Sequence, residues 1–200
     1  MAFDPGATQA DDPLARCAVL VERGRLADAR GEVPMVLATA DQAGNPAARY
    51  VLLKEIDGRG FVFYTNARSR KGRELAARPR AALVIYWPAL GEQVRVEGQV
   101  EEVEPALADA YWATRPLASR IGAMASAQSE PLESRAALEE RVEQLAEALG
   151  AEEPERPEHW SGYRVVPDAI EFWRRREDRL HDRELYRRGD EGWTRTLLWP

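Results

Sequence analysis

The chain has 200 residues, of which 44% are hydrophobic and 31% charged, and this size and balance fit one globular domain with an ordinary core. The formal net charge of −6 argues against general binding of nucleic acid or of an anionic membrane, because both need a broadly basic surface. The single cysteine, Cys17, excludes an internal disulfide and a thiolate zinc cluster, and with only two histidines and no long apolar window we expect a metal-free cytoplasmic protein without membrane spans.

The first half of the chain is predicted to begin with a tail and a helix and to continue as strands. Residues 1–12 are small, acidic and contain Pro and Gly, which predicts a mobile tail ahead of a single domain at 13–200. Pro13 can open a helix, whose apolar spacing runs to about Ala29. From Pro34 the spacing becomes that of strands separated by Gly and Pro turns. The elements predicted here are strands at 35–40, 47–54 and 61–65, a helix at 69–77, and strands at 81–87 and 93–103.

The second half contains two predicted helices and four further strands. Pro105 opens a helix that ends before Arg115-Pro116, and Arg115 and Ser119 are expected on the turn that follows. Gly150 ends a longer helix with one apolar face, and an acidic linker with prolines follows it. The strands predicted next are 163–166, 169–173, 183–187 and 193–198, the last two joined by a hairpin at 189–192.

These elements together predict a fold class. Closely spaced antiparallel strands with helices inserted between them indicate a mainly β protein with flanking helices, in which the late strands close a small barrel. A doubly wound parallel sheet is not expected, and the chain contains neither a GxGxxG nor a GxxxxGK[ST] loop.

Only two of the 28 Lys and Arg residues are lysines, and both, Lys54 and Lys71, lie in one short basic stretch. A lysine is a compact point charge that suits phosphate, although two lysines this close can also arise by chance. Basic groups at strand ends that face a helix N-terminus form a site for a dianion. We therefore predict an anion site, with solvated surface charge as the alternative, from Arg49, Arg70, Lys71, Gln128 and Ser129.

A second basic group is predicted from Lys54, Tyr111, Arg115 and Ser119, of which the last three recur at every fourth residue. Two anion sites on one acidic protein imply two phosphorylated ligands, namely a cofactor and a substrate. This arrangement points to an enzyme.

A third dense patch follows the predicted strand Ile170-Glu-Phe-Trp173. If Arg179, His181 and Arg183 belong to one strand, their side chains point to the same side. The alternatives are that Trp173 is a core residue and that His181 is structural.

Eight short motifs occur along the chain in a fixed order. They are Arg49-Tyr-Val-Leu-Leu-Lys54, Phe63-Tyr-Thr-Asn66, Ser69-Arg-Lys71, Gln93-Val-Arg-Val-Glu-Gly98, Arg115-Pro116, Gln128-Ser129, Ile170-Glu-Phe-Trp173 and Arg179-Leu-His-Asp-Arg183. Together they resemble the pyridoxamine 5′-phosphate oxidase family from about Pro34 to Pro200. The resemblance implies an FMN-binding split β-barrel that forms a homodimer with the flavin at the subunit interface, and a C-terminal dimerisation and active-site segment at about 159–200.

The resemblance also implies an activity and its residues. Members of this family oxidise pyridoxamine or pyridoxine 5′-phosphate to pyridoxal 5′-phosphate by hydride transfer from C4′ to flavin N5, with O2 as the electron acceptor and H2O2 as the by-product. The catalytic residues implied are Arg179, which orients the ring because it stays charged, and His181 in a supporting polar role. The substrate-binding residues implied are Lys54, Tyr111, Arg115, Ser119, Arg179 and His181. The FMN-binding residues implied are Arg49, Tyr50, Val51, Leu52, Leu53, Lys54, Tyr64, Thr65, Arg70, Lys71, Gln93, Gln128, Ser129, Trp173 and Arg183.

The chain departs from the family pattern at three places. The residues before Pro13 lack a basic, tyrosine-bearing segment, Glu92 stands where an arginine is usual, and Arg174-Arg175-Arg176 follows Trp173. These changes bear on substrate closure and turnover more than on FMN binding. Two alternatives remain open, a related flavin oxidase that acts on another ring, of the phenazine-pathway type, and a non-catalytic flavin-binding module.

Overall fold

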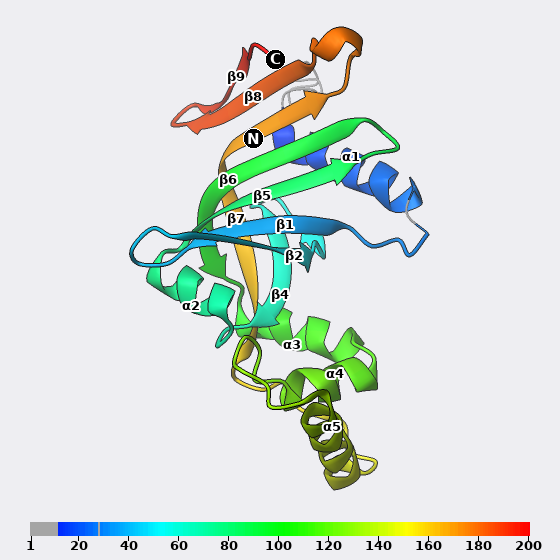
Figure 1. Cartoon of the computed structure of the whole chain (residues 1–200). Helices are drawn as coiled ribbons and strands as arrows, with labels where there is room; N and C mark the ends of the chain where they lie inside the picture. Colours follow the sequence, from blue (N-terminus) through cyan, green and yellow to red (C-terminus); the bar gives the residue numbers. More distant parts are fainter. Residues whose placement is uncertain (1–11, 28) are drawn as a thin grey trace, which may run out of the picture.

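The computed structural model describes residues 12–27 and 29–200. The predicted mobile tail at 1–12 therefore lies outside the described residues, apart from Asp12. In the described part, one curled antiparallel sheet is flanked by helices (Figure 1). Its elements are α1 (Pro13–Ala27), β1 (Pro34–Ala40), β2 (Pro46–Leu52), β3 (Glu55–Ile56), β4 (Phe61–Asn66), α2 (Arg70–Ala77), β5 (Arg80–Trp87), β6 (Glu92–Glu102), α3 (Pro105–Thr114), α4 (Leu117–Ala125), α5 (Arg135–Leu149), β7 (Trp160–Arg174), the 3-10 helix η1 (Glu177–Arg179), β8 (Asp182–Gly189) and β9 (Gly192–Leu197).

The strands follow the order β2-β1-β5-β6-β7-β4-β3, and β8 and β9 continue from β7. Every pairing is antiparallel, which confirms the predicted mainly β fold with flanking helices. The sheet curls into a half-barrel, with the β8–β9 hairpin at one end of the molecule and α3, α4 and α5 at the other (Figure 1). No helix of the described part is both long and apolar enough to cross a membrane.

Alternating strand residues form the core inside the half-barrel. In β1 the buried positions are Met35, Leu37 and Thr39, as expected for a strand with one face covered. Phe61 and Phe63 of β4 are fully buried in the same core. Burial of these side chains supplies most of the free energy that holds the sheet in its curled form.

The strands predicted at 163–166 and 169–173 are one continuous strand, β7. Pro167 lies between the two predicted strands, and a register shift between Glu97 and Gly98 of β6 accommodates it. Proline has no N–H to donate to the ladder, so it is tolerated where a bulge already interrupts the pairing. The two-residue strand β3 was also missed, because it is too short to show an alternating pattern.

One prediction about local structure near the candidate residues is wrong, and the condition stated for another group of residues is not met. Ser119 lies in helix α4 and not on a turn, because Pro116 serves as the N-cap of α4, where a missing N–H costs nothing. Arg179 and His181 do not lie on a strand with Arg183. The 3-10 helix η1, in which Arg179 has a positive φ of 63°, precedes β8.

Helix ends follow the expected capping chemistry. Ser69 caps α2 by accepting a hydrogen bond from the Gly72 amide, and Ser134 caps α5 in the same way. Gly150, with φ of 56°, ends α5 as predicted.

The pairing of β4 with β7 places Gly162 directly opposite Tyr64. A Cβ on Gly162 would lie 2.6 Å from both Tyr64 Cε1 and Val103 Cγ2. We therefore expect Gly162→Ala to lower the free energy of unfolding by roughly 1–3 kcal/mol, because the Tyr64 ring must move. Gly58→Ala is the matched control, since nothing lies within 4 Å of the Cβ position there. Equal urea midpoints for the two variants would contradict this account of Gly162.

Candidate functional site

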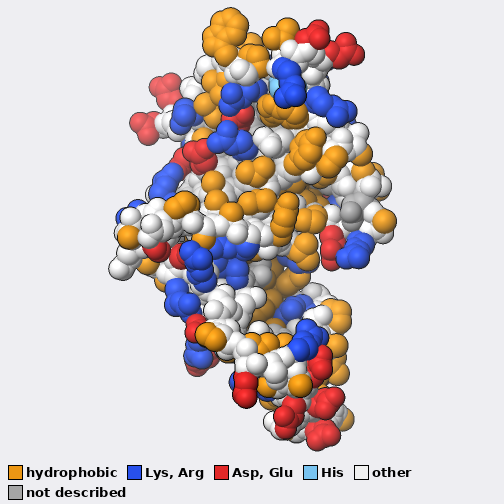
Figure 2. Space-filling view, viewed as in Figure 1, with side chains coloured by type: hydrophobic (Ala, Val, Ile, Leu, Met, Phe, Trp, Pro, Cys, Tyr) orange, Lys and Arg blue, Asp and Glu red, His pale blue; other side chains and the backbone are white. Residues whose placement is uncertain are grey.

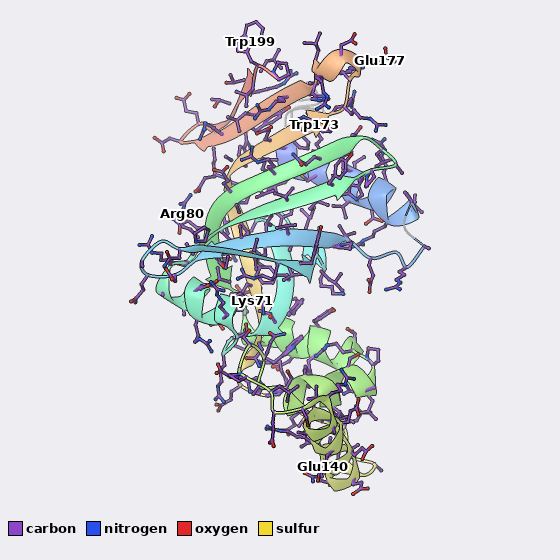
Figure 3. The ribbon with its side chains drawn as sticks, viewed as in Figure 1. Lys71, Arg80, Glu140, Trp173, Glu177 and Trp199 are labelled. Carbon is purple, nitrogen blue, oxygen red and sulfur yellow. The ribbon has the colours of Figure 1, made fainter. Side chains whose placement is uncertain are left out.

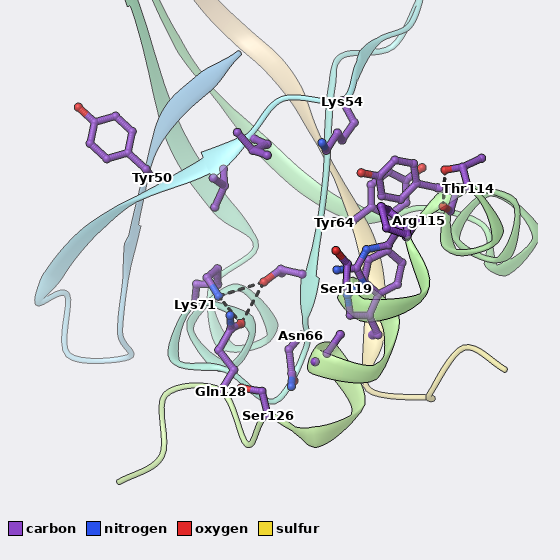
Figure 4. Close-up of a pocket in the computed structure, with 18 of the residues that line it drawn as sticks. Tyr50, Lys54, Tyr64, Asn66, Lys71, Thr114, Arg115, Ser119, Ser126 and Gln128 are labelled. Carbon is purple, nitrogen blue, oxygen red and sulfur yellow. Dashed lines mark hydrogen bonds between the residues drawn. The ribbon is translucent and has the colours of Figure 1, made fainter. Parts of the chain in front are cut away.

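A cavity of about 760 Å³ lies between the outer strands of the sheet and helices α3 and α4. This volume is in the range of small-molecule and cofactor sites. Lys71 and Gln128 stand on one side of it and Arg115 and Ser119 on the other (Figure 4). Members of both predicted anion groups therefore line one shared cavity. The predicted residues that line it are Tyr50, Val51, Leu52, Lys54, Tyr64, Thr65, Lys71, Tyr111, Arg115, Ser119 and Gln128.

The ammonium of Lys71 is buried and has only neutral acceptors. Its Nζ donates to Thr65 Oγ1 at 3.0 Å and Gln128 Oε1 at 2.8 Å (Figure 4), and also to Ser69 Oγ at 2.9 Å. Burial lowers the pKa of Lys71 to about 8, the charge of Arg49 acts in the same direction, and Glu74 opposes them. A buried cation without a bonded carboxylate is stabilised by an incoming anion. Lys71 is therefore suited to hold a phosphate group.

Arg49 and Arg70, two other members of the first group, do not line the cavity. Both bind the buried carboxylate of Glu74, Arg49 through Nη2 at 3.1 Å and Arg70 through Nε at 2.7 Å. Burial alone would raise the pKa of Glu74, but hydrogen bonds from Thr39, Arg70 and Arg49 lower it overall. Glu74 is not among the predicted residues, and its only signal in the sequence is its place one helical turn after Arg70.

Aromatic rings form the other side of the cavity. Tyr64 stacks on Tyr111 with ring centroids 4.0 Å apart and on Trp160 at 5.5 Å. The Arg115 guanidinium lies 4.7 Å from the Trp160 ring centroid, and Lys54 Nζ lies 5.7 Å from that of Tyr111. The two cations of the second group are thus placed against aromatic faces.

Arg115 has an unsatisfied donor in this arrangement. Its Nη1 is buried without a hydrogen-bond partner. Burial also lowers the pKa of Arg115, although an arginine keeps its charge in proteins. A buried N–H without an acceptor is costly, so this atom marks a position where an anionic oxygen would be stabilised.

Some lining residues were not predicted. Trp160 falls between the predicted linker at 151–158 and the predicted strand at 163–166, and Asn66, Thr114 and Ser126 carry no charge or spacing that could have singled them out. The first residue of β7 reaches the cavity only because β4 pairs with β7, with Asn66 opposite Trp160.

Other predicted residues lie away from the cavity. Leu53 belongs to the hydrophobic core, and Ser129 is exposed with a φ of 75°. Trp173 lies near β8 and β9, whereas Lys71 lies in α2, toward the other end of the half-barrel (Figure 3). The predicted residues at the Trp173 end are Gln93, Trp173, Arg179, His181 and Arg183.

Contacts at this second end are well defined. Arg183 donates to both oxygens of the buried Glu171, at 2.8 and 3.1 Å, and Trp173 lies 4.6 Å from the His181 ring. Two of the departures from the family pattern are partners here, because Glu92 pairs with Arg174 across β6 and β7, 3.4 Å apart. An acid at position 92 is thus matched by a base at position 174.

The surface carries charge unevenly. Lys and Arg side chains gather over α2 and the neighbouring strands, whereas acidic side chains gather at the free end of α5 (Figure 2). The cavity lining holds the cations Lys54, Lys71 and Arg115 and the carboxylate Glu32. A cationic cavity on a chain of net charge −6 favours a small anionic ligand.

The half-barrel fold places the chain in a class of protein known from solved structures. A pyridoxamine 5′-phosphate oxidase-related, FMN-binding protein from Nostoc punctiforme shares the fold, with a TM-score of 0.75 and 20% identity over 94% of this chain and 98% of that one. PhzG from Burkholderia lata, solved in complex with tetrahydrophenazine-1-carboxylic acid, has a TM-score of 0.89 and 33% identity over 100% of this chain and 98% of its own.

The sequence comparisons define the family. Residues 27–148 match the pyridoxamine 5′-phosphate oxidase family, and residues 160–200 match the pyridoxine 5′-phosphate oxidase C-terminal dimerisation region. The chain therefore belongs to the pyridoxine/pyridoxamine 5′-phosphate oxidase family. Relatives of that name include one from Myxococcus xanthus, 54% identical over 94% of this chain and 92% of its own, and one from Thermosynechococcus vestitus, 53% identical over 96% and 90%. The predictions of this family, of its fold and of an oxidase enzyme are confirmed.

The low pKa of Lys71 predicts a pH-dependent stability. The folded pKa of about 8 lies below the unfolded value of 10.5, so the unfolded chain binds more protons between these pH values, and stability must rise with pH across that window. Relative to Lys71→Met, we expect the free energy of unfolding of the wild type to rise by roughly 1 kcal/mol per pH unit between pH 8 and 10. Urea titrations of both proteins measure this difference, and parallel pH profiles would show that Lys71 is not desolvated.

Proposed function

We propose that this protein is an FMN-dependent oxidase that converts pyridoxamine or pyridoxine 5′-phosphate to pyridoxal 5′-phosphate in the cytoplasm. The observation that carries the proposal is the shared cavity, which holds Lys71 on one side and Lys54 and Arg115 on the other. Two separated cationic positions fit two phosphorylated ligands that must meet, one a cofactor and the other a substrate.

Lys71 is the proposed ligand of the FMN phosphate. Its three neutral hydrogen-bond partners orient the ammonium without neutralising it. Arg49 and Arg70, held by Glu74 near the start of α2, add positive potential at this end. Val51 and Leu52 of β2 supply an apolar part of the lining for the flavin ring. When bound, FMN supplies the two-electron acceptor for oxidation at C4′ and passes those electrons to O2, with release of H2O2.

Arg115, Lys54, Tyr111 and Ser119 are the proposed contacts of the substrate phosphate. The buried, unpartnered Nη1 of Arg115 supports this assignment, because a phosphate oxygen would satisfy it. Ser119 in α4 is exposed to the cavity and can donate a hydroxyl hydrogen bond.

Arg179 and His181 are proposed to act on the substrate ring from the partner subunit. Within one subunit they belong to the β8–β9 end, away from the cavity. They fall in the segment that matches the family's dimerisation region, so a symmetric homodimer can bring the partner's Arg179 and the partner's His181 to the cavity. Trp173, Arg183 and Gln93 would complete the FMN site by the same route.

The turnover prediction is direct. Holoenzyme mixed with pyridoxamine 5′-phosphate without oxygen should lose its visible flavin absorbance, and admission of O2 should restore it with pyridoxal 5′-phosphate and H2O2 as products. Spectrophotometry with an anaerobic cell measures both steps. A flavin that binds and never bleaches would instead support a non-catalytic flavin-binding module.

The likeness to PhzG favours one alternative, a flavin oxidase that acts on another ring. That protein was solved with a carboxylate-bearing phenazine precursor, and a carboxylate is also an anion that arginine can bind. The retained group of Lys54, Tyr111 and Arg115 favours a phosphate. Oxidation of an unphosphorylated ring together with inactivity toward pyridoxamine 5′-phosphate would select the alternative.

Mutations in the two cation groups should affect different quantities, KM for the substrate in one group and FMN retention in the other. We expect Arg115→Ala or Lys54→Ala to raise KM for pyridoxamine 5′-phosphate about tenfold or more with little loss of FMN, because each removes a charge-assisted bond to the substrate. Lys71→Ala should do the reverse and weaken FMN retention. The control is Arg73→Ala. Arg73 lies on the same helix as Lys71, and its replacement breaks only an exposed ion pair with Glu130. If all three site variants changed KM and FMN retention equally, the division into two sites would be wrong.

A further inference from the structure

The cations of the proposed substrate side differ from their neighbours in what faces them. Within residues 12–27 and 29–200, no ion pair to a carboxylate involves Lys54 or Arg115, whereas Arg49 and Arg70 both bind Glu74. Lys54 faces the ring of Tyr111, and Arg115 lies against two indole rings, 4.7 Å from the Trp160 centroid and 5.1 Å from that of Trp112.

An aromatic face and a carboxylate stabilise a cation in different ways. A carboxylate accepts the hydrogen bonds of the guanidinium and cancels its charge, so an incoming anion must compete with it. A ring attracts the cation through its quadrupole, and this attraction is stronger when the cation is desolvated. The ring leaves the N–H groups in the guanidinium plane available to an incoming anion. Arg115 shows this result, because its buried Nη1 has no hydrogen-bond partner.

The two indoles are themselves fixed in place. Trp112 is 3% exposed, and its Nε1 donates to the Pro154 carbonyl at 2.8 Å. Trp160 is 5% exposed and packs edge-on against Trp112, with centroids 4.9 Å apart. Trp160 also stacks with Tyr64, so its ring position is set from β4, α3 and the start of β7 together.

We propose that Trp160, supported by Trp112, is a positioning residue that holds Arg115 as an unneutralised cation for the anionic group of the substrate. The inference rests on the proposed function, in that the anion is assigned to a phosphorylated pyridine. It extends that function in two ways. It names residues outside the predicted substrate-binding set, and it gives a physical reason for a preference for phosphorylated over unphosphorylated rings. Discrimination between phosphorylated and unphosphorylated rings depends on the indole under Arg115 as well as on Arg115.

The test compares binding of two non-oxidisable ligands to FMN-loaded enzyme by calorimetry. The ligands are 4-deoxypyridoxine 5′-phosphate and 4-deoxypyridoxine, in which C4′ is a methyl carbon and which differ only in the phosphate. We expect Trp160→Leu to raise the Kd of the phosphorylated ligand about tenfold, because the desolvated cation–π contact is lost, and to change that of the unphosphorylated ligand less than about twofold. Trp160→Phe keeps a ring and should recover most of the affinity.

Two controls make the result specific. Trp193→Leu removes the ring of another such contact, 4.6 Å from the Arg188 guanidinium in the β8–β9 hairpin, and should leave both Kd values unchanged. Retained flavin absorbance shows that Trp160→Leu still folds and holds FMN. Equal weakening of both ligands by Trp160→Leu, or no weakening of either, would overturn the inference.

The same experiment separates this inference from the proposed function. Wild-type enzyme that prefers the phosphorylated ligand, with Trp160→Leu abolishing that preference, supports the role of Trp160 even if pyridoxamine 5′-phosphate is never oxidised. In that outcome only the proposed reaction fails. Wild-type enzyme that shows no preference for the phosphorylated ligand overturns the role of Trp160.

Discussion

The pairing of β7 with three other strands is the constraint on which the rest of the molecule depends. This strand of 15 residues pairs with β4 near its start, with β6 along most of its length and with β8 near its end. Its first residue, Trp160, therefore lies in the cavity, while Trp173 near its end lies against His181. A shift of one residue in the pairing would turn every side chain of the strand to the other face of the sheet. The bulge at Gly98 and Pro167 therefore helps set which side chains of β7 face the core and which face the cavity.

The molecule stabilises its buried and half-buried cations in three ways. Buried carboxylates hold arginines that need a fixed orientation, as Glu74 does for Arg49 and Glu171 does for Arg183. Neutral oxygens surround Lys71, whose pKa falls to about 8 as a result of burial. Aromatic rings face Lys54 and Arg115. Only the last two ways leave net positive charge, and those cations are the ones that line the cavity.

The predicted residues are divided between two ends of the half-barrel, and a homodimer can bring the two groups together. One end holds the cavity and the other holds Arg179, His181 and Arg183, in a segment that matches a dimerisation region. A single subunit cannot bring Arg179 to Arg115 without unpairing β7 from β8. On the proposed function, association of two subunits completes the site as well as adding stability.

The sequence by itself determined the family, the antiparallel mainly β fold and most residues of the cavity, since short motifs such as Arg49 to Lys54 and Ser69 to Lys71 act through local chemistry. Strand alternation and helix ends are local too, which is why Pro105 and Gly150 could be interpreted correctly.

Only the tertiary structure decided which cations are neutralised and which are free. Apart from the spacing of Glu74 one helical turn after Arg70, Glu74 and Trp160 carry no sequence signal for their roles, because each acts on a partner that strand pairing or helix packing brings to it. The continuity of β7 through Pro167 and the helical setting of Ser119 were likewise decided by neighbouring segments. Local patterns specify elements, whereas the electrostatic state of a buried group depends on everything packed around it.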